Sequence, residues 1–180
     1  MNAVLLLNAL SFASLKHRDQ RRKDASASPY INHPIAVATV LAAEGFVTDE
    51  HLLVAATLHD TVEDTQTTFA ELKEHFGATV ADLVREVTDD KALEKEHRKQ
   101  LQIEHARFSS ANAKQLKIAD KICNLRDIAA NPPSDWSLDR RREYLSWAGE
   151  VVQGCRGVNS SLDAAFDAAV EHARQRLSDG

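Results

Sequence analysis

Two histidines and two aspartates in the sequence could together hold a divalent metal ion. His59 and Asp60 are adjacent at the end of an apolar segment, and His33 and Asp120 lie in two other segments. Imidazole and carboxylate ligands together suit manganese, zinc or iron. An unpaired charge at the end of a buried helix would be costly, and a bound cation would remove that cost. The sequence therefore makes these four residues a candidate metal site.

The segment 113–130 gives the strongest argument for a buried polar site. Its apolar residues predict a helix that is hydrophobic over much of its circumference and well buried. Asp120, Asn124 and Asp127 nevertheless recur at helical spacing along this segment. A salt bridge from a neighbouring lysine would explain Asp120 alone, but it would not explain the whole row as well as a polar site does.

His33 also has a simpler structural explanation, because it directly precedes Pro34. Proline is favoured at the first position of a helix, so His33 is the predicted N-cap of a helix that ends at Gly45. The remaining histidines have no comparable context, and we interpret all six as surface or loop residues: His17, His51, His75, His97, His105 and His172.

Glu63 and Asp64 follow Asp60 by three and four positions. Two carboxylates so close to a metal ligand could position and deprotonate an attacking water molecule, which makes both residues candidates for catalysis. The alternative is a solvated acidic loop over residues 61–67. The composition of this segment leaves both interpretations open.

Arg22 and Lys23 belong to a basic run in the predicted loop 17–32, about ten residues before the first candidate metal ligand. Arginine offers a planar fork for phosphate and can stack on a base, and lysine offers a point charge. The run is therefore a candidate nucleotide-binding loop, with solvated surface as the alternative. Arg140 and Tyr144, four residues apart, could form a second binding face, although helix packing explains them equally well.

Helical periodicity runs through nearly the whole sequence, and strand alternation is almost absent. Thr48 is the predicted N-cap of the helix that leads to His59, and Thr68 and Glu71 have the spacing of a capping box. Further helices are predicted over about 78–88, 94–107, 113–130, 137–153 and 160–177. No repeat or linker divides the chain, so residues 1–180 are predicted to form a single all-α helical bundle.

The composition excludes several classes of protein. A formal net charge of −5 disfavours a nucleic-acid-binding protein, which needs a basic surface. Cys123 and Cys155 lack the spacing of a disulfide framework or zinc site, which favours a reducing compartment. No apolar run is long enough to cross a membrane, and the N-terminal segment lacks the features of a signal peptide. We therefore expect a cytoplasmic protein that binds neither nucleic acid nor membrane.

Four ordered motifs resemble the hydrolase domain of RelA/SpoT proteins, a family within the HD-domain superfamily. The likeness is greatest to the small stand-alone alarmone hydrolases, which include the metazoan SpoT homologues. The motifs are RRKD at 21–24, PYINHP at 29–34, LHDTVEDT at 58–65 and KIADKICNLR at 117–126. Any one of these motifs would be a weak signal, but four in this order and spacing are a strong one.

The resemblance implies a single HD-domain helical bundle with one bound manganese ion. The implied activity is hydrolysis of ppGpp and pppGpp, which releases pyrophosphate from the 3′ position and leaves GDP or GTP. The implied roles are metal ligation by His33, His59, Asp60 and Asp120, catalysis by Glu63 and Asp64, and nucleotide contact by Arg22, Lys23 and Asn124.

Two other functions remain open at this point. One is an HD-type phosphatase that acts on another nucleotide, either a deoxynucleotide or the 2′-phosphate of NADPH. The other is a nucleotide-sensing module without catalytic activity, although such a module would not need the carboxylates of Glu63 and Asp64. The sequence does not indicate an oligomeric state.

Overall fold

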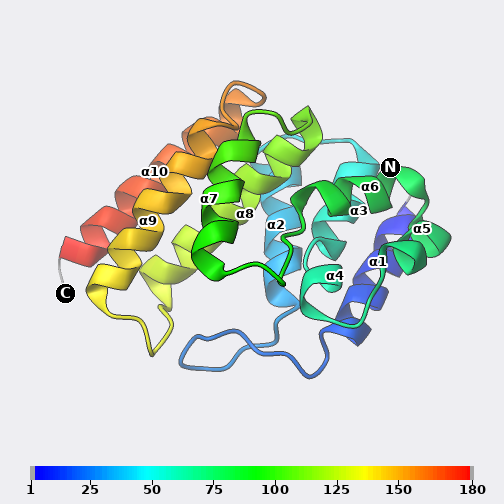
Figure 1. Ribbon diagram of the computed structural model, residues 1–180, viewed down its shortest axis with the longest axis horizontal. Coiled ribbons are helices and arrows are strands. Elements are labelled where there is room, and N and C mark those ends of the chain that lie inside the picture. The colour runs from blue at the N-terminus through cyan, green and yellow to red at the C-terminus, as the bar shows by residue number, and fades with distance from the viewer. Residues whose placement is uncertain (1–2, 179–180) are drawn as a thin grey trace.

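The computed structural model describes residues 3–178, which form ten helices and no strand (Figure 1). The helices are α1 Ala3–Lys16, α2 Asn32–Ala43, α3 Glu50–Leu58, α4 Thr61–Asp64, α5 Phe69–Phe76, α6 Ala78–Val87, α7 Lys95–Ala106, α8 Ala111–Ala130, α9 Leu138–Gln153 and α10 Ser160–Ser178. The predicted all-α fold is thus confirmed. The first two and last two residues of the predicted domain lie outside the described residues. Among the described helices, none has both the length and the apolar character needed to cross a membrane.

Helix α8 is the central element of the bundle. It packs against α2, α6, α9 and α10, and it lies in the middle of the molecule in Figure 1. More than half of its residues are buried, among them Leu116, Ile118, Ile122 and Leu125. The predicted buried helix is therefore confirmed, and polar groups on α8 lie at the centre of the fold.

Helix α3 is buried from Leu52 to Leu58, which places the residues that follow it deep in the molecule. The N-cap of this helix is Asp49, so the prediction of Thr48 was wrong by one residue. Asp49 accepts hydrogen bonds from the backbone amides of His51 at 2.9 Å and Leu52 at 3.3 Å. An aspartate carboxylate suits this position because it also favours the positive end of the helix dipole.

The segment after His59 and Asp60 is more regular than the predicted loop over 61–67. It begins with α4, a single helical turn over residues 61–64. The Thr61 hydroxyl donates to the Leu58 carbonyl at 2.6 Å, and the Thr65 hydroxyl donates to the Thr61 carbonyl at 2.6 Å. These local hydrogen bonds stabilise the turn, a pattern that hydrophobic periodicity cannot detect in so short a segment.

Helix α2 begins earlier than predicted, and His33 is not its N-cap. The N-cap position is Ile31, whose side chain makes no capping hydrogen bond. The backbone amide of His33 already donates to the Tyr30 carbonyl at 3.0 Å, so His33 lies inside the first turn. Its imidazole is therefore not used for capping, and it points into the bundle.

Candidate metal centre and nucleotide cleft

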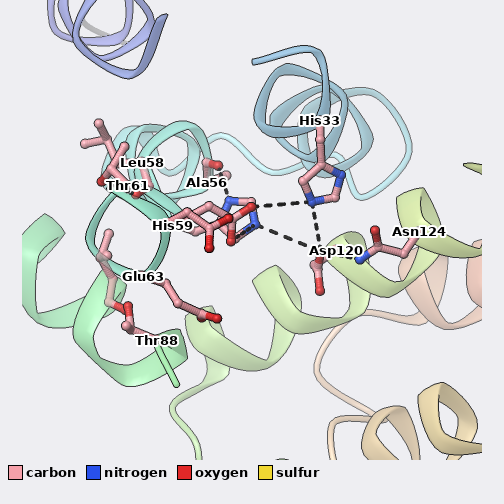
Figure 2. Close-up of polar contacts among 12 residues, drawn as sticks. His33, Ala56, Leu58, His59, Thr61, Glu63, Thr88, Asp120 and Asn124 are labelled. Atoms are coloured by element: carbon pink, nitrogen blue, oxygen red, sulfur yellow. Dashed lines mark hydrogen bonds and ion pairs between the residues drawn. The ribbon is translucent and has the colours of Figure 1, made fainter. Parts of the chain in front are cut away.

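Three segments of the chain bring the four predicted metal ligands together, and Figure 2 labels three of these residues, His33, His59 and Asp120. His33 comes from α2, His59 and Asp60 follow α3, and Asp120 comes from α8. His33 Nε2 lies 3.1 Å from Asp120 Oδ1 and 3.8 Å from Asp60 Oδ2. His59 Nε2 lies 3.3 Å from Asp60 Oδ1 and 3.9 Å from Asp120 Oδ1. Ligand atoms of His33, His59 and Asp60 all lie within 4.8 Å of one another, close enough to hold one metal ion.

The buried His59 ring has the arrangement expected of a metal ligand. Its Nδ1 donates to the Ala56 carbonyl at 2.8 Å, which leaves Nε2 directed toward Asp60 and Asp120. Nε2 is buried and has no hydrogen-bond partner among residues 3–178. Burial alone would lower the pKa of His59, but the two carboxylates outweigh it and raise that pKa. The site thus favours a positive charge, which a proton or a metal cation can supply.

Asp120 is held in place by its neighbours on α8 and by His33. Its Oδ1 accepts from Asn124 Nδ2 at 2.7 Å, and its Oδ2 accepts from Lys121 Nζ at 2.9 Å. Burial alone would raise the pKa of Asp120, but Lys121 and the contact with His33 hold it well below its usual range. The lysine salt bridge considered as an alternative thus exists alongside the polar row, and neither excludes a metal role for Asp120.

The two candidate catalytic carboxylates have different surroundings. Burial, together with the charges of Asp60 and Asp89, raises the pKa of Glu63 to about 7. Burial would also raise the pKa of Asp64, but hydrogen bonds from Lys91 and Gln20 outweigh it and lower that pKa. Glu63 is therefore suited to exchange a proton near neutral pH, whereas Asp64 remains an anion fixed by its partners.

Two neighbouring cavities share wall residues at this cluster. The larger has a volume of about 690 Å³ and lies along the loop between α1 and α2, and the smaller has about 180 Å³. Of the predicted ligands, His59, Asp60 and Asp120 line only the smaller cavity, whereas His33 borders both. The residues shared by the two cavities are Arg22, Tyr30, His33 and Asn124. The larger cavity has a size typical of small-molecule sites, and the smaller one is mainly polar.

Comparison with known proteins identifies the family. The model of a family described as "HD domain" matches residues 9–146, which is more than half of the chain. The chain belongs to the HD domain family. The region that matches the HD domain contains all four candidate metal ligands and ends within α9.

The sequence similarity between this HD domain protein and its relatives extends over nearly its whole length. It is 54% identical over 166 residues to guanosine-3′,5′-bis(diphosphate) 3′-pyrophosphohydrolase MESH1 of Xenopus tropicalis, covering 92% of this chain and 93% of that one. It is 55% identical over 164 residues to the protein of the same name from Homo sapiens, with coverage of 91% and 92%. A solved structure, described as a metazoan orthologue of SpoT that hydrolyses ppGpp and plays a role in starvation responses, matches with a TM-score of 0.90. That match has 50% identity and covers 96% and 95% of the two chains.

The basic loop of the HD domain is folded against the cleft through Arg22. This guanidinium forms an ion pair with Asp127 and donates to Asn124 Oδ1 at 3.3 Å. It also lies 5.7 Å from the centre of the Tyr30 ring. Its side chain is only 19% exposed, so Arg22 is largely covered by these neighbours. Lys23 lines the larger cavity and is exposed.

The aromatic and basic face near the C-terminal part of the HD domain is only partly in the cleft. Tyr144 lines the larger cavity together with Trp136, and their rings are 5.6 Å apart. Burial raises the pKa of Tyr144 to about 12, so its hydroxyl remains a hydrogen-bond donor at neutral pH. Arg140 does not line the cavity; its guanidinium packs 4.5 Å from the centre of the Trp136 ring. Arg140 therefore packs on a residue of the cavity wall and is not itself part of that wall.

The sequence interpretation missed three residues that connect the loop to the site. The Tyr30 hydroxyl donates to Asp60 Oδ2 at 2.7 Å, and Gln20 Nε2 donates to Asp64 Oδ2 at 3.0 Å. His17, interpreted as a surface residue, is 2% exposed, and its ring lies 4.8 Å from that of Tyr30. Tyr30 lies in the motif PYINHP, and this position could have identified it as a site residue. No sequence feature indicates the burial of His17, because that burial depends on how the loop folds.

Proposed function

We propose that this protein is a metal-dependent guanosine-3′,5′-bis(diphosphate) 3′-pyrophosphohydrolase that converts ppGpp and pppGpp to GDP and GTP with release of pyrophosphate. The observation that carries the substrate assignment is the 54% identity, over 92% of this chain, to a relative that bears this name. The geometry supports the same conclusion, because a polar cavity with the candidate metal ligands shares four wall residues with a cavity large enough for a nucleoside.

The metal ion is proposed to be Mn²⁺, held by His33, His59, Asp60 and Asp120. The unpartnered Nε2 of His59 and the carboxylates around it fit a cation of this kind. When bound, a divalent cation supplies Lewis acidity, which polarises a phosphoryl oxygen and makes water more acidic. The Tyr30 hydroxyl fixes the orientation of Asp60, as a supporting residue of a metal ligand does.

Glu63 and Asp64 are proposed to have separate tasks in the hydrolysis. Glu63 lines the smaller cavity and has a pKa raised to about 7, so it accepts the proton of the attacking water. Asp64 lines the larger cavity, where Lys91 and Gln20 hold it as an anion. Its role is then to position groups at the junction of the cavities without transferring a proton.

The guanine nucleotide is proposed to occupy the larger cavity. Arg22 and Asn124 stand where the two cavities meet and are placed to contact phosphate, and Lys23 adds a positive charge at the outer side. Tyr144 offers a ring and a hydroxyl to the nucleoside, while Arg140 supports the neighbouring Trp136. The larger cavity therefore supplies recognition and the smaller one supplies the chemistry.

Residues 1–180 are proposed to act as a single HD hydrolase domain in the cytoplasm. Helix α10, which follows the matched region, packs extensively on α8 and so completes the same bundle. Cys123 and Cys155 are both free and buried, which suits a reducing compartment. The negative net charge of −5 supports a small-molecule substrate in place of nucleic acid.

The proposal is tested by product analysis with ppGpp and Mn²⁺. We expect GDP and pyrophosphate in equal amounts, and no turnover after chelation of the metal. Parallel reactions with NADPH and with deoxynucleotides test the other phosphatase activities. Release of inorganic phosphate from those substrates without cleavage of ppGpp would overturn the assignment, and binding of ppGpp without turnover would indicate a sensing module.

A further inference from the structure

Lys117 is a buried lysine to which the chemistry described above gives no role. It lies on α8, and its side chain lines the smaller cavity, with the residue only 9% exposed. Among residues 3–178, its ammonium group has no hydrogen bond or ion pair. The group has little contact with solvent and no acceptor of its own, which leaves it available to bind an anion.

Lys121, one turn further along α8, shows what a paired lysine looks like in the same cavity. Its Nζ donates to Asp120 Oδ2 at 2.9 Å and lies 4.6 Å from the centre of the Trp147 ring. Burial would lower the pKa of Lys121, but Asp120 outweighs it and raises that pKa. For Lys117 the balance is opposite, since burial and the charge of Lys121 lower its pKa. The two lysines share a helix and a cavity, but only Lys121 forms a direct ion pair; Asp89 and Asp120 act on Lys117 without a direct contact to its ammonium group.

The smaller cavity around Lys117 contains carboxylates, so an anion that enters it requires a positive charge to offset their repulsion. The smaller cavity is also lined by the carboxylates of Glu63 and Asp89, which would repel a phosphate group. Asp89 already accepts a hydrogen bond from Gln102 at 2.6 Å, and Glu63 accepts one from the Asp89 amide at 3.3 Å. Arg22 and Lys121 also line this cavity, but they are paired with Asp127 and Asp120, so Lys117 is the basic side chain there that is free to offset the repulsion.

We propose that Lys117 binds the pyrophosphate group that leaves the substrate, and that the smaller cavity is the pyrophosphate pocket. This inference rests on the proposed function, which places the 3′ phosphates beside the candidate metal ligands. The pocket has about a quarter of the volume of the larger cavity, 180 Å³ against 690 Å³, so it suits phosphoryl groups better than a nucleoside. Lys117 then neutralises the leaving group and gains the partner that the free protein lacks.

The test compares Lys117→Met with Lys114→Met in the Mn²⁺-loaded protein. Methionine removes the charge and keeps the apolar stem, and Lys114 lies on the same helix but does not line the cavity. Inorganic pyrophosphate is the probe, measured by calorimetry and as an inhibitor of turnover. We expect Lys117→Met to weaken pyrophosphate binding by about 10- to 100-fold and Lys114→Met to leave it unchanged. Bound Mn²⁺ and the circular dichroism spectrum should match the wild type in both variants.

Several results would decide the proposal. Wild-type pyrophosphate affinity in a folded, Mn²⁺-loaded Lys117→Met variant would overturn it, as would an equal loss in the Lys114→Met control. Lys117→Gln serves as the neutral variant if the methionine variant does not fold, and the same loss is expected. If the wild type binds pyrophosphate through Lys117 but does not cleave ppGpp, the pocket stands and the proposed function fails. If the protein cleaves ppGpp but both Lys117 variants bind pyrophosphate as well as the wild type does, the proposed function stands and the role of Lys117 fails.

Discussion

The two cavities differ in how the chain builds them. The smaller one is lined mainly by residues of helices α2, α4, α6, α7 and α8 and by the two residues that follow α3, and its polar groups are fixed by short contacts such as those of Asp120. The larger one is bordered on one side by the loop 17–31, whose only regular feature is an isolated bridge between Arg21 and Pro29. Rigid helices thus hold the groups that perform chemistry, and a loop borders the space for the nucleotide. Substitutions in the smaller cavity should therefore affect turnover, and those in the larger cavity should affect capture of substrate.

The largest effect is expected for Asp120→Asn, which removes one charge from the metal site and keeps the shape of the side chain. Loss of the cation removes several kcal/mol of transition-state stabilisation, so kcat should fall by about 1,000-fold or more. Metal analysis of the purified variant should show weak Mn²⁺ retention. Full Mn²⁺ occupancy with normal turnover would remove Asp120 from the site.

Glu63→Gln should show the next largest effect, because it removes the proposed proton acceptor and leaves the metal ligands intact. We expect turnover to fall by about 100-fold while much of the ppGpp affinity remains. Because Glu63 must be deprotonated to act and its pKa is raised to about 7, wild-type kcat/KM should rise with pH through that region. Steady-state kinetics across this pH range should show a much weaker rise in the variant. An unchanged rate would reduce Glu63 to a structural carboxylate, and Asp64→Asn provides the parallel test.

Arg22→Ala tests the larger cavity and should have a moderate effect. Loss of a cation next to a base or phosphate corresponds to about 5- to 30-fold in kcat/KM, with Mn²⁺ content unchanged. The variant should also melt at a lower temperature, because Arg22 is partly buried and paired with Asp127. Arg18→Ala is the control, since this side chain is 69% exposed and does not line either cavity. Wild-type kcat/KM in Arg22→Ala at both low and high salt would remove Arg22 from the substrate-binding residues.

The smallest effect is expected at the ion pair between Glu44 and Arg126, neither of which lines either of the two cavities. The two guanidinium nitrogens of Arg126 lie 2.6 and 2.8 Å from the Glu44 carboxylate oxygens. The pair is well exposed, so Glu44→Gln should cost only about 0.2–1 kcal/mol of unfolding free energy and leave kcat unchanged. Arg126 lowers the pKa of Glu44, so this stabilisation is present at neutral pH and is lost as pH falls through the lowered pKa. Denaturant unfolding at two pH values measures the stabilisation. A fall in the kcat of Glu44→Gln would contradict the expectation that a residue outside both cavities does not affect turnover.

The sequence was most informative where side-chain type and helical period act together. The row of Asp120 and Asn124 on an apolar helix predicted a buried polar site, and the structure brings Asp120 to within 3.1 Å of His33. The sequence was least informative where short local contacts decide the conformation. The turn of α4 depends on the hydroxyls of Thr61 and Thr65, and the choice of Asp49 over Thr48 as N-cap depends on which oxygen reaches the first-turn amides.

Contacts between distant segments were also beyond prediction. The pairing of Arg22 with Asp127 and of Gln20 with Asp64 connects residues more than 40 positions apart. Such pairs become neighbours only when the loop 17–31 folds back across the bundle, as Figure 1 shows. Arg140 is a local case: the sequence left a binding face and helix packing open, and in the structure its guanidinium lies 4.5 Å from the centre of the Trp136 ring and does not line the larger cavity.

The central claim is that one metal ion in the smaller cavity is the centre of the chemistry. The most direct measurement is anomalous diffraction at the manganese edge from crystals of the Mn²⁺-loaded protein. We predict a single strong peak bounded by His33 Nε2, His59 Nε2 and carboxylate oxygens of Asp60 and Asp120. A peak elsewhere in the molecule, or no peak from protein that turns over ppGpp in the same Mn²⁺ solution, would contradict this account.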